Sequence, residues 1–209
     1  MAVSKIIVVG AAGKSGREIV EEALARGIGL TAYVRSRAKA EGLPAGVTIV
    51  EGDGKDAAAL ARALPGHDAV VVTSGGRTET VSAEVAKAVV AAMKQAGITR
   101  LIQYSAYGAN DGKGIYRWVM QTLASKVAAD KIELEKVLAA SGLEWTAVRP
   151  GVLTDGGKSG KMRAGTGVVL KGFPQISRAD VAQFVLDELQ TPHFVKAAPV
   201  LYVEGTQRI

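Results

Sequence analysis

The chain has 209 residues, no cysteine and a formal charge of +6, and 48% of its residues are hydrophobic. That size allows one substantial core, while the missing cysteines exclude disulfides and thiolate chemistry. Basic residues are scattered and aromatic residues make up only 5%, which disfavours a nucleic-acid-binding protein. No apolar run approaches the roughly 18 residues that span a bilayer, and the amino terminus is not typical of a secretory signal. We expect a cytoplasmic protein that binds neither nucleic acid nor membrane, as a monomer or homodimer.

The first element is an apolar strand, residues 5–9, which runs into three glycines spaced G-x-x-G-x-x-G and then into an amphipathic helix. Strand, glycine turn and helix form the context in which such a motif binds a dinucleotide. Gly10 permits the tight turn, Gly13 lets the backbone approach a diphosphate, and Gly16 lets the helix pack on the strand. The free N–H groups and the helix dipole then face the phosphates. The alternative is a glycine-rich turn without a ligand.

Strands and helices continue to alternate through the middle of the chain. Short apolar runs predict four more strands, at residues 30–34, 47–51, 68–72 and 100–104. Asp56 is expected to cap a helix that runs through Leu64, and a longer helix covers residues 81–95 and is closed by Gly97.

The last hundred residues are harder to interpret. Residues 106–125 are a loop with a short helix or lid at 116–120, and a helix covers residues 126–140. A sixth strand at 145–149 is stopped by Pro150, a glycine- and lysine-rich loop covers 153–167, and residues 168–170 add a seventh strand. Ser177 is expected to cap a helix that ends near Leu189, and residues 199–203 form a final short strand.

This alternation predicts an α/β fold over residues 1–209, a single domain with a doubly wound parallel sheet of about seven strands and helices on both faces. In an open parallel sheet, ligands bind beyond the carboxyl ends of the strands. The residues that follow each strand are therefore the candidate site, and the loops 106–125 and 153–167 are expected to form its substrate pocket.

The residue after the second strand predicts the cofactor. A protein that prefers NAD usually has an acid here, whereas this chain has Arg35, followed by Ser36 and Arg37. A guanidinium can pair with a 2′-phosphate, so NADP is favoured over NAD. The alternative is a solvated surface arginine.

Polar or small residues follow the other strands as well. Asp53 can accept a hydrogen bond from an adenine amino group, or can be an ordinary turn former. Residues 73–76 are small enough to lie against ribose and diphosphate, and Arg77 either folds over the phosphates or is solvated. Ser105 lies where nicotinamide and substrate would meet, unless its hydroxyl is satisfied by neighbouring groups. Pro150 and the residues after it can present backbone groups to the carboxamide.

These residues, in this order, resemble the atypical branch of the short-chain dehydrogenase/reductase superfamily over nearly the whole chain. Within it, the short length and the Ala-Ala-Met-Lys segment before a glycine-terminated helix end are most similar to the biliverdin reductase B/flavin reductase type, with NmrA-like neighbours. The resemblance implies a Rossmann fold, NADPH as cofactor and hydride transfer to a small-molecule acceptor such as a flavin or a tetrapyrrole. It implies no metal site and a catalytic role for Ser105 on the substrate side. The residues for which it implies a role in cofactor binding are Gly10, Ala12, Gly13, Lys14, Ser15, Gly16, Arg35, Ser36, Asp53, Gly54, Thr73, Ser74, Gly75, Arg77, Pro150, Gly151 and Val152.

One departure from the superfamily limits the chemistry. Conventional members use Tyr-x-x-x-Lys, in which the lysine helps the phenol to deliver a proton. Here Lys131 has Val127 in the tyrosine's place, and Lys131 can equally be a surface residue paired with Glu135. We therefore favour an NADPH-dependent reductase of a conjugated acceptor. The alternatives are a redox-sensing NADP-binding protein without turnover, similar to NmrA-like proteins, and an epimerase or dehydratase-like enzyme.

Overall fold

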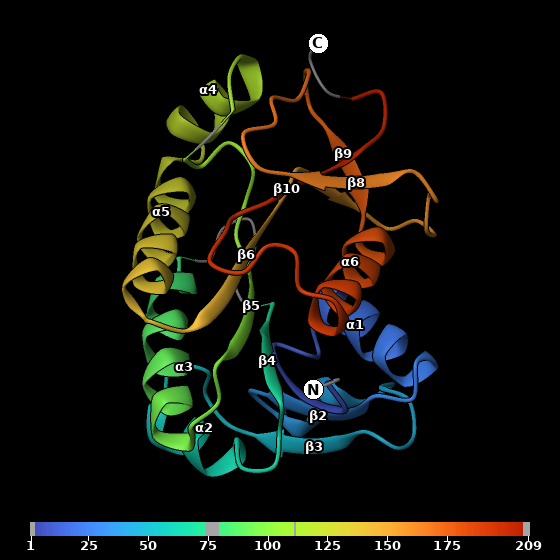
Figure 1. Ribbon diagram of the computed structural model, residues 1–209, viewed down its shortest axis with the longest axis vertical. Helices are drawn as coiled ribbons and strands as arrows, with labels where there is room; N and C mark the ends of the chain where they lie inside the picture. Colours follow the sequence, from blue (N-terminus) through green and yellow to red (C-terminus); the bar gives the residue numbers. More distant parts are fainter. Residues whose placement is uncertain (1–2, 74–79, 111, 207–209) are drawn as a thin grey trace.

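The computed structural model describes residues 3–73, 80–110 and 112–206, and a sheet runs through it from one end to the other (Figure 1). The strand order in this eight-stranded sheet is β3-β2-β1-β4-β5-β6-β10-β8. Every neighbouring pair is parallel except β10 and β8, which are antiparallel. Its strands are β1 (Lys5–Val9), β2 (Gly29–Val34), β3 (Thr48–Glu51), β4 (Ala69–Val72), β5 (Arg100–Tyr104), β6 (Glu144–Pro150), β8 (Met162–Gly165) and β10 (Val200–Val203).

Helices cover both faces of the sheet, as the alternating pattern predicts. On one face α1 packs against α6, and on the other α3 packs against α2 and α5 (Figure 1). A separate pair of short strands, β7 (Val152–Thr154) and β9 (Gln175–Ser177), lies beyond the end of β6. The helices are α1 (Lys14–Ala25), α2 (Ala57–Ala63), α3 (Ser82–Ala96), α4 (Ile115–Thr122), α5 (Ser125–Ala140) and α6 (Arg178–Gln190), with a 3₁₀ turn η1 (Arg37–Ala40).

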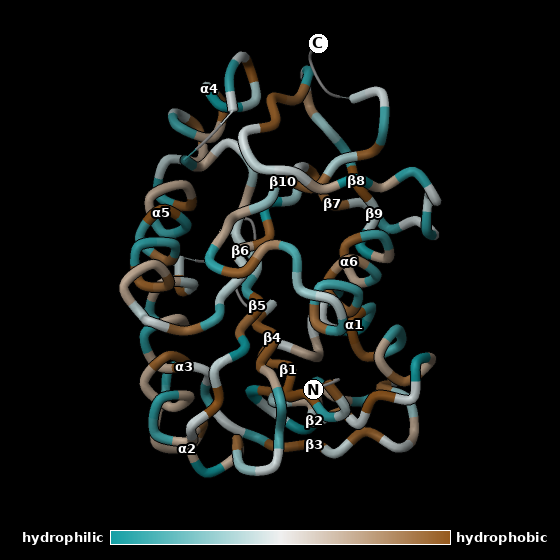
Figure 2. Tube along the Cα trace, viewed as in Figure 1, coloured by the Kyte–Doolittle hydropathy of each residue, from teal (hydrophilic) through white to brown (hydrophobic). Residues whose placement is uncertain are grey.

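The sheet separates two large apolar clusters. One contains the inner faces of α1 and α6, and the other those of α2, α3 and α5. All four residues of β4 are buried because helices cover both of its faces, which explains why the strand has no polar alternation. The hydrophobic colour along β1 and β4 in Figure 2 marks this centre. The fold is a single Rossmann-like α/β domain, as expected.

The local signals for helix ends are confirmed. The Asp56 carboxylate accepts the Ala59 N–H at 2.9 Å, and Ser177 Oγ accepts the Asp180 N–H at the same distance. Gly97 ends α3 in the left-handed region, at φ 71°. No described helix is long and apolar enough to cross a membrane.

The prediction for residues 153–170 is wrong. Residues 168–170 form no strand, because β8 takes the edge position beside β10, and the Leu170 N–H instead donates to the Tyr107 hydroxyl at 2.9 Å. The predicted loop 153–167 thus contains β8 and most of β7. The sixth strand ends at Pro150 as predicted, with Pro150 as its last residue. The Pro150 carbonyl accepts the Tyr107 N–H at 2.9 Å, and Pro150 pairs with Leu201 of β10.

Candidate active site

A cleft of about 1090 Å³ lies beyond the carboxyl ends of the parallel strands. The residues that follow six of them line it, which is where an open parallel sheet binds its ligands. The predicted site residues among its walls are Gly10, Ala12, Gly13, Lys14, Ser15, Gly16, Arg35, Asp53, Gly54, Thr73, Ser105, Pro150, Gly151 and Val152. Ser36 is not among the lining residues, and Ser74, Gly75 and Arg77 lie outside the described residues.

The three glycines of the turn differ in whether the structure of the protein requires a glycine at that position. Gly10 has φ 89°, a conformation that L side chains rarely adopt. A Cβ on Gly16 would lie 2.3 Å from the Gly10 carbonyl oxygen and 2.6 Å from Ala11 Cα, so Gly16 is required by packing. A Cβ on Gly13 would meet only the Gly10 oxygen, at 3.4 Å. The protein itself therefore tolerates a Cβ at Gly13, the position where a diphosphate would approach.

The amino end of α1 is suited to an anion. Gly13 caps the helix without a side-chain hydrogen bond, and the first turn contains no acidic residue. The first N–H groups of a helix have no intrahelical acceptor, and the dipole is positive there. Lys14 adds a cation, whose ammonium donates to Asp155 at 2.7 Å, and Asp155 also pairs with Arg178 of α6. The turn, the free N–H groups and Lys14 therefore fit a dinucleotide diphosphate.

Arg35 and Asp53 lie at the nucleotide end of the cleft, after β2 and β3. Asp53 Oδ1 accepts the Lys55 N–H at 3.0 Å, which is the turn-forming bond, while the exposed carboxylate still borders the cleft. A Cβ on Gly54 would lie 3.2 Å from Val9, so this glycine serves packing. The cations at this end and the absence of an acid directly after β2 favour a phosphorylated ribose.

Ser105 is buried and already has a partner. Its hydroxyl donates to Glu135 Oε1 at 2.6 Å, and Arg149 Nε donates to the same oxygen at 2.8 Å. Glu135 is therefore not the surface partner of Lys131 that the i,i+4 spacing predicts. Because the hydroxyl proton of Ser105 is directed to α5, its lone pairs are what this side chain offers to a molecule in the cleft.

Lys131 is also buried, which overturns its interpretation as a charged residue on a helix face. Its ammonium donates to Ser82 Oγ at 2.8 Å and to the Tyr104 carbonyl oxygen at 3.3 Å. Burial lowers the pKa of Lys131 to about 8, partly offset by the nearby charges of Asp130 and Glu135. Its contact with Tyr104 uses the backbone oxygen and not the phenol, and Val127 borders the cleft one turn earlier.

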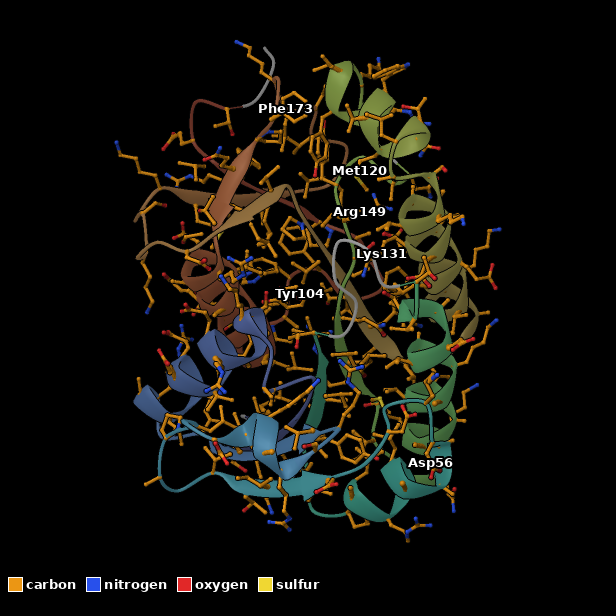
Figure 3. All side chains as sticks on the ribbon, turned by 180° about the vertical axis from the view of Figure 1, so that it is seen from behind. Asp56, Tyr104, Met120, Lys131, Arg149 and Phe173 are labelled. Atoms are coloured by element: carbon orange, nitrogen blue, oxygen red, sulfur yellow. The ribbon has the colours of Figure 1, made fainter. Side chains whose placement is uncertain are left out.

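The far end of the cleft is apolar and aromatic, and we call it the acceptor chamber. Tyr116 stacks on Tyr107 with ring centroids 5.7 Å apart and meets the edge of Phe173 at 5.8 Å. Figure 3 shows Met120 and Phe173 at the same end of the molecule, with Lys131 and Arg149 nearer its middle. The chamber is formed by Tyr116, Val119, Met120, Ala124, Val127, Leu153 and Phe173.

The two predicted substrate loops contribute unequally to this chamber. Residues 106–125 supply Tyr116, Val119, Met120 and Ala124 to its lining, whereas the loop 153–167 supplies only Leu153, and the role of these loops in binding a substrate stays a prediction. Sequence reasoning missed Phe173, and also Tyr104 and Arg178, which line the cleft. The burial of Lys131 could have been predicted from the sequence, because Leu134 and Leu138 follow it at helical spacing and both are fully buried.

Residues 10–192 match the sequence profile of a family described as NAD(P)H-binding. Two proteins of Bacillus subtilis are similar over most of their lengths. YwnB, an uncharacterized protein, is 32% identical and aligns over 90% of this chain and 93% of its own. YhfK, named an uncharacterized sugar epimerase, is 30% identical over 88% of this chain and 87% of its own.

Among solved structures, ChuY of Escherichia coli O157:H7, an anaerobilin reductase, is similar with a TM-score of 0.82 and 26% identity. The similarity covers 98% of this chain and 100% of ChuY. It therefore extends from the glycine turn through the acceptor chamber and α6.

Proposed function

Because the chain belongs to the NAD(P)H-binding family, we propose that it is an NADPH-dependent reductase of a planar conjugated acceptor, such as a flavin or a tetrapyrrole. The observation that carries this proposal is the continuity of the cleft. One cavity of about 1090 Å³ joins the glycine turn to the aromatic acceptor chamber. Apolar and aromatic walls with few polar groups are what a flat conjugated ring needs.

The cofactor would be held by residues that fit its phosphates. The turn at Gly13 and the N–H groups of α1 would bind the diphosphate, and Arg35 would pair with the 2′-phosphate. The backbone of residues 150–152 would hold the nicotinamide carboxamide beside Ser105. NADPH bound in this way supplies a hydride.

Ser105 and Lys131 line the same cleft as the chamber, but the sequence lacks the Tyr-x-x-x-Lys pair that reduces carbonyls. Val127 offers no proton, and the Ser105 proton is directed to Glu135. Lys131 places a positive charge beside the cleft, which favours negative charge that develops on an acceptor. A conjugated ring delocalises that charge and takes its proton from water, so alignment against Tyr116 and Phe173 supplies much of the rate.

An NADPH oxidation screen tests the proposal. The acceptors would be FMN, riboflavin, biliverdin, a quinone and a set of simple aldehydes and ketones. We expect NADPH oxidation with the conjugated acceptors and almost none with the carbonyls, because a missing positioned acid costs about 10²–10⁴ in rate. Brisk reduction of ordinary carbonyls without reduction of any conjugated ring would contradict it.

The specific observation that favours a second candidate is Val127 in place of the tyrosine. A protein that binds NADP without turnover, as in the NmrA-like alternative, needs the cofactor end of the cleft but no acid. Tight NADPH binding with no oxidation by any acceptor in the screen would favour that function. An epimerase, the activity in the name of YhfK, is less well supported because it needs proton transfer that Val127 cannot provide.

A further inference from the structure

Although basic residues are scattered along the whole chain, two segments contain basic residues and no acidic ones, so their net charge is positive. Residues 112–129 contain three Lys or Arg and no Asp or Glu, and residues 156–179 contain five and none. Together they exceed the +6 of the whole chain, so the remainder of the sequence is net negative. Such an asymmetry indicates an electrostatic role for the surface that these segments form.

Both segments border the acceptor chamber. The first contains α4 with Tyr116 and Met120, and the second contains Phe173. In Figure 3 Met120 and Phe173 lie at the same end of the molecule, while Asp56 of the nucleotide half lies at the opposite end. The net positive charge of the two segments is therefore at the acceptor end of the cleft.

Three lysines that lie within three residues of chamber residues in the sequence are exposed and have no ion pair or side-chain hydrogen bond with any described residue: Lys113, Lys126 and Lys171. Lys126 adjoins Val127, and the other two are two or three residues from Phe173 and Tyr116. We call these three lysines the lysine rim.

Three other cations of the second segment are in ion pairs. Lys158 pairs with Glu22 at 2.6 Å, Arg163 pairs with Glu204 at 3.0 Å, and Arg178 pairs with Asp155. The charge of the rim is not used in this way, and it stands beside low-dielectric apolar walls, which strengthen a field at the mouth of a cleft.

We propose that the acceptor is an anion, a planar conjugated molecule whose carboxylate or phosphate groups face the lysine rim while its ring packs against the aromatic wall formed by Tyr116 and Phe173. This inference rests on the reductase function proposed above and narrows its substrate class. The cofactor's own phosphates do not explain the rim, because Arg35, Lys39 and Lys55 line the other end of the cleft.

Two pairs of probes separate charge from ring structure. FMN and riboflavin share one ring system, but only FMN carries a phosphate. Biliverdin and its dimethyl ester share another, but only biliverdin carries free carboxylates. Binding of each probe would be measured by fluorescence or absorbance with the NADP⁺-loaded protein, in which no turnover occurs. We expect the charged member of at least one pair to bind about tenfold more tightly, with a difference that shrinks at high salt.

The test variant combines Lys113→Gln, Lys126→Gln and Lys171→Gln. Its matched control combines Lys5→Gln, Lys94→Gln and Lys196→Gln, which removes the same charge from exposed lysines near the amino ends of the strands. The rim variant should bind the charged probe about three- to tenfold more weakly. It should bind the neutral probe and NADPH as the unmodified protein does, and the control should change neither affinity.

Equal affinity for the charged and neutral members of both pairs would overturn the inference, and so would equal losses in the rim variant and the control. Failure to bind any of the four probes would also contradict it. If the protein preferred the charged probes in binding but oxidised no NADPH with any acceptor in the screen, the inference of an anionic ligand would stand. The proposed reductase function would then be wrong.

Discussion

The Ser105 hydroxyl donates to the Glu135 carboxylate across 2.6 Å, so the one serine that follows β5 directs its proton into α5 and away from the cleft. Arg149 holds the same carboxylate from β6. The arrangement fixes the side chain at the acceptor end of the cleft as an acceptor of hydrogen bonds. It argues against Ser105 as the acid of the reaction.

Ser105→Ala should therefore slow turnover by less than about tenfold, far short of the loss expected for a general acid. It should lower the free energy of unfolding by about 1–2 kcal/mol, because the buried Glu135 loses one donor and keeps Arg149. Steady-state kinetics and urea unfolding measure the two effects, with the exposed Ser125→Ala as control. A loss of about a thousandfold or more in kcat, with the fold intact, would make Ser105 an essential acid.

Gly13→Val should abolish NADPH binding and leave the protein folded. The added Cβ would make only an ordinary contact, 3.4 Å from the Gly10 oxygen, but the side chain would fill the place of the diphosphate, and φ −74° suits any residue. Gly16→Ala is the contrasting variant, because its Cβ would collide with the backbone of the turn and should destabilise the fold. Circular dichroism and a binding titration separate the two outcomes. Normal NADPH affinity in a folded Gly13→Val protein would refute the cofactor site.

Arg35→Glu should weaken NADPH binding by about 1–3 kcal/mol, the scale of a charge-assisted hydrogen bond, and leave NADH binding nearly unchanged. Arg37→Glu is the matched control, since Arg37 is exposed and does not line the cleft. The measurement is a titration of each variant with both cofactors. If the unmodified protein bound NADPH and NADH equally, the assignment of Arg35 to the 2′-phosphate would be wrong.

Lys131 should make stability depend on pH in an alkaline window. Burial lowers its pKa from 10.5 to about 8, so the native state binds fewer protons than the unfolded state between those values. Stability relative to Lys131→Met should then rise with pH across that window, by about 3 kcal/mol in total. Unfolding of both proteins at several pH values gives the difference. If the difference in unfolding free energy between the two proteins did not vary with pH, Lys131 would have the same pKa in the native and unfolded states, which would contradict the prediction.

The sequence predicts the parts of this molecule that depend on neighbouring residues. The glycine turn and the caps at Asp56 and Ser177 act within a few residues, and all three are found where the pattern places them. Contacts between distant segments were not predictable in this way. Leu170 bonds to Tyr107 instead of extending a strand, and Phe173 reaches the chamber from outside the loop that was expected to supply it.

The burial of Lys131 and Glu135 was also not predictable from their spacing in the sequence. Lys131 and Glu135 have the spacing of a surface ion pair, yet both are buried and point to different partners, Ser82 and Arg149. A charged residue on the apolar face of a helix indicates such a role, because burying a charge is costly unless it is paired. The cytoplasmic location and the oligomeric state stay predictions.

The central claim is that NADPH bound in the cleft transfers a hydride to a conjugated ring bound in the same cleft. An anaerobic single-turnover experiment tests this claim most directly. The protein would be mixed with stoichiometric NADPH and either FMN or biliverdin, and both cofactor and acceptor absorbance would be followed. The account predicts that each NADPH oxidised reduces one acceptor, with no reaction above the uncatalysed rate in Gly13→Val. NADPH that binds tightly to the unmodified protein and remains unoxidised with both acceptors would contradict it.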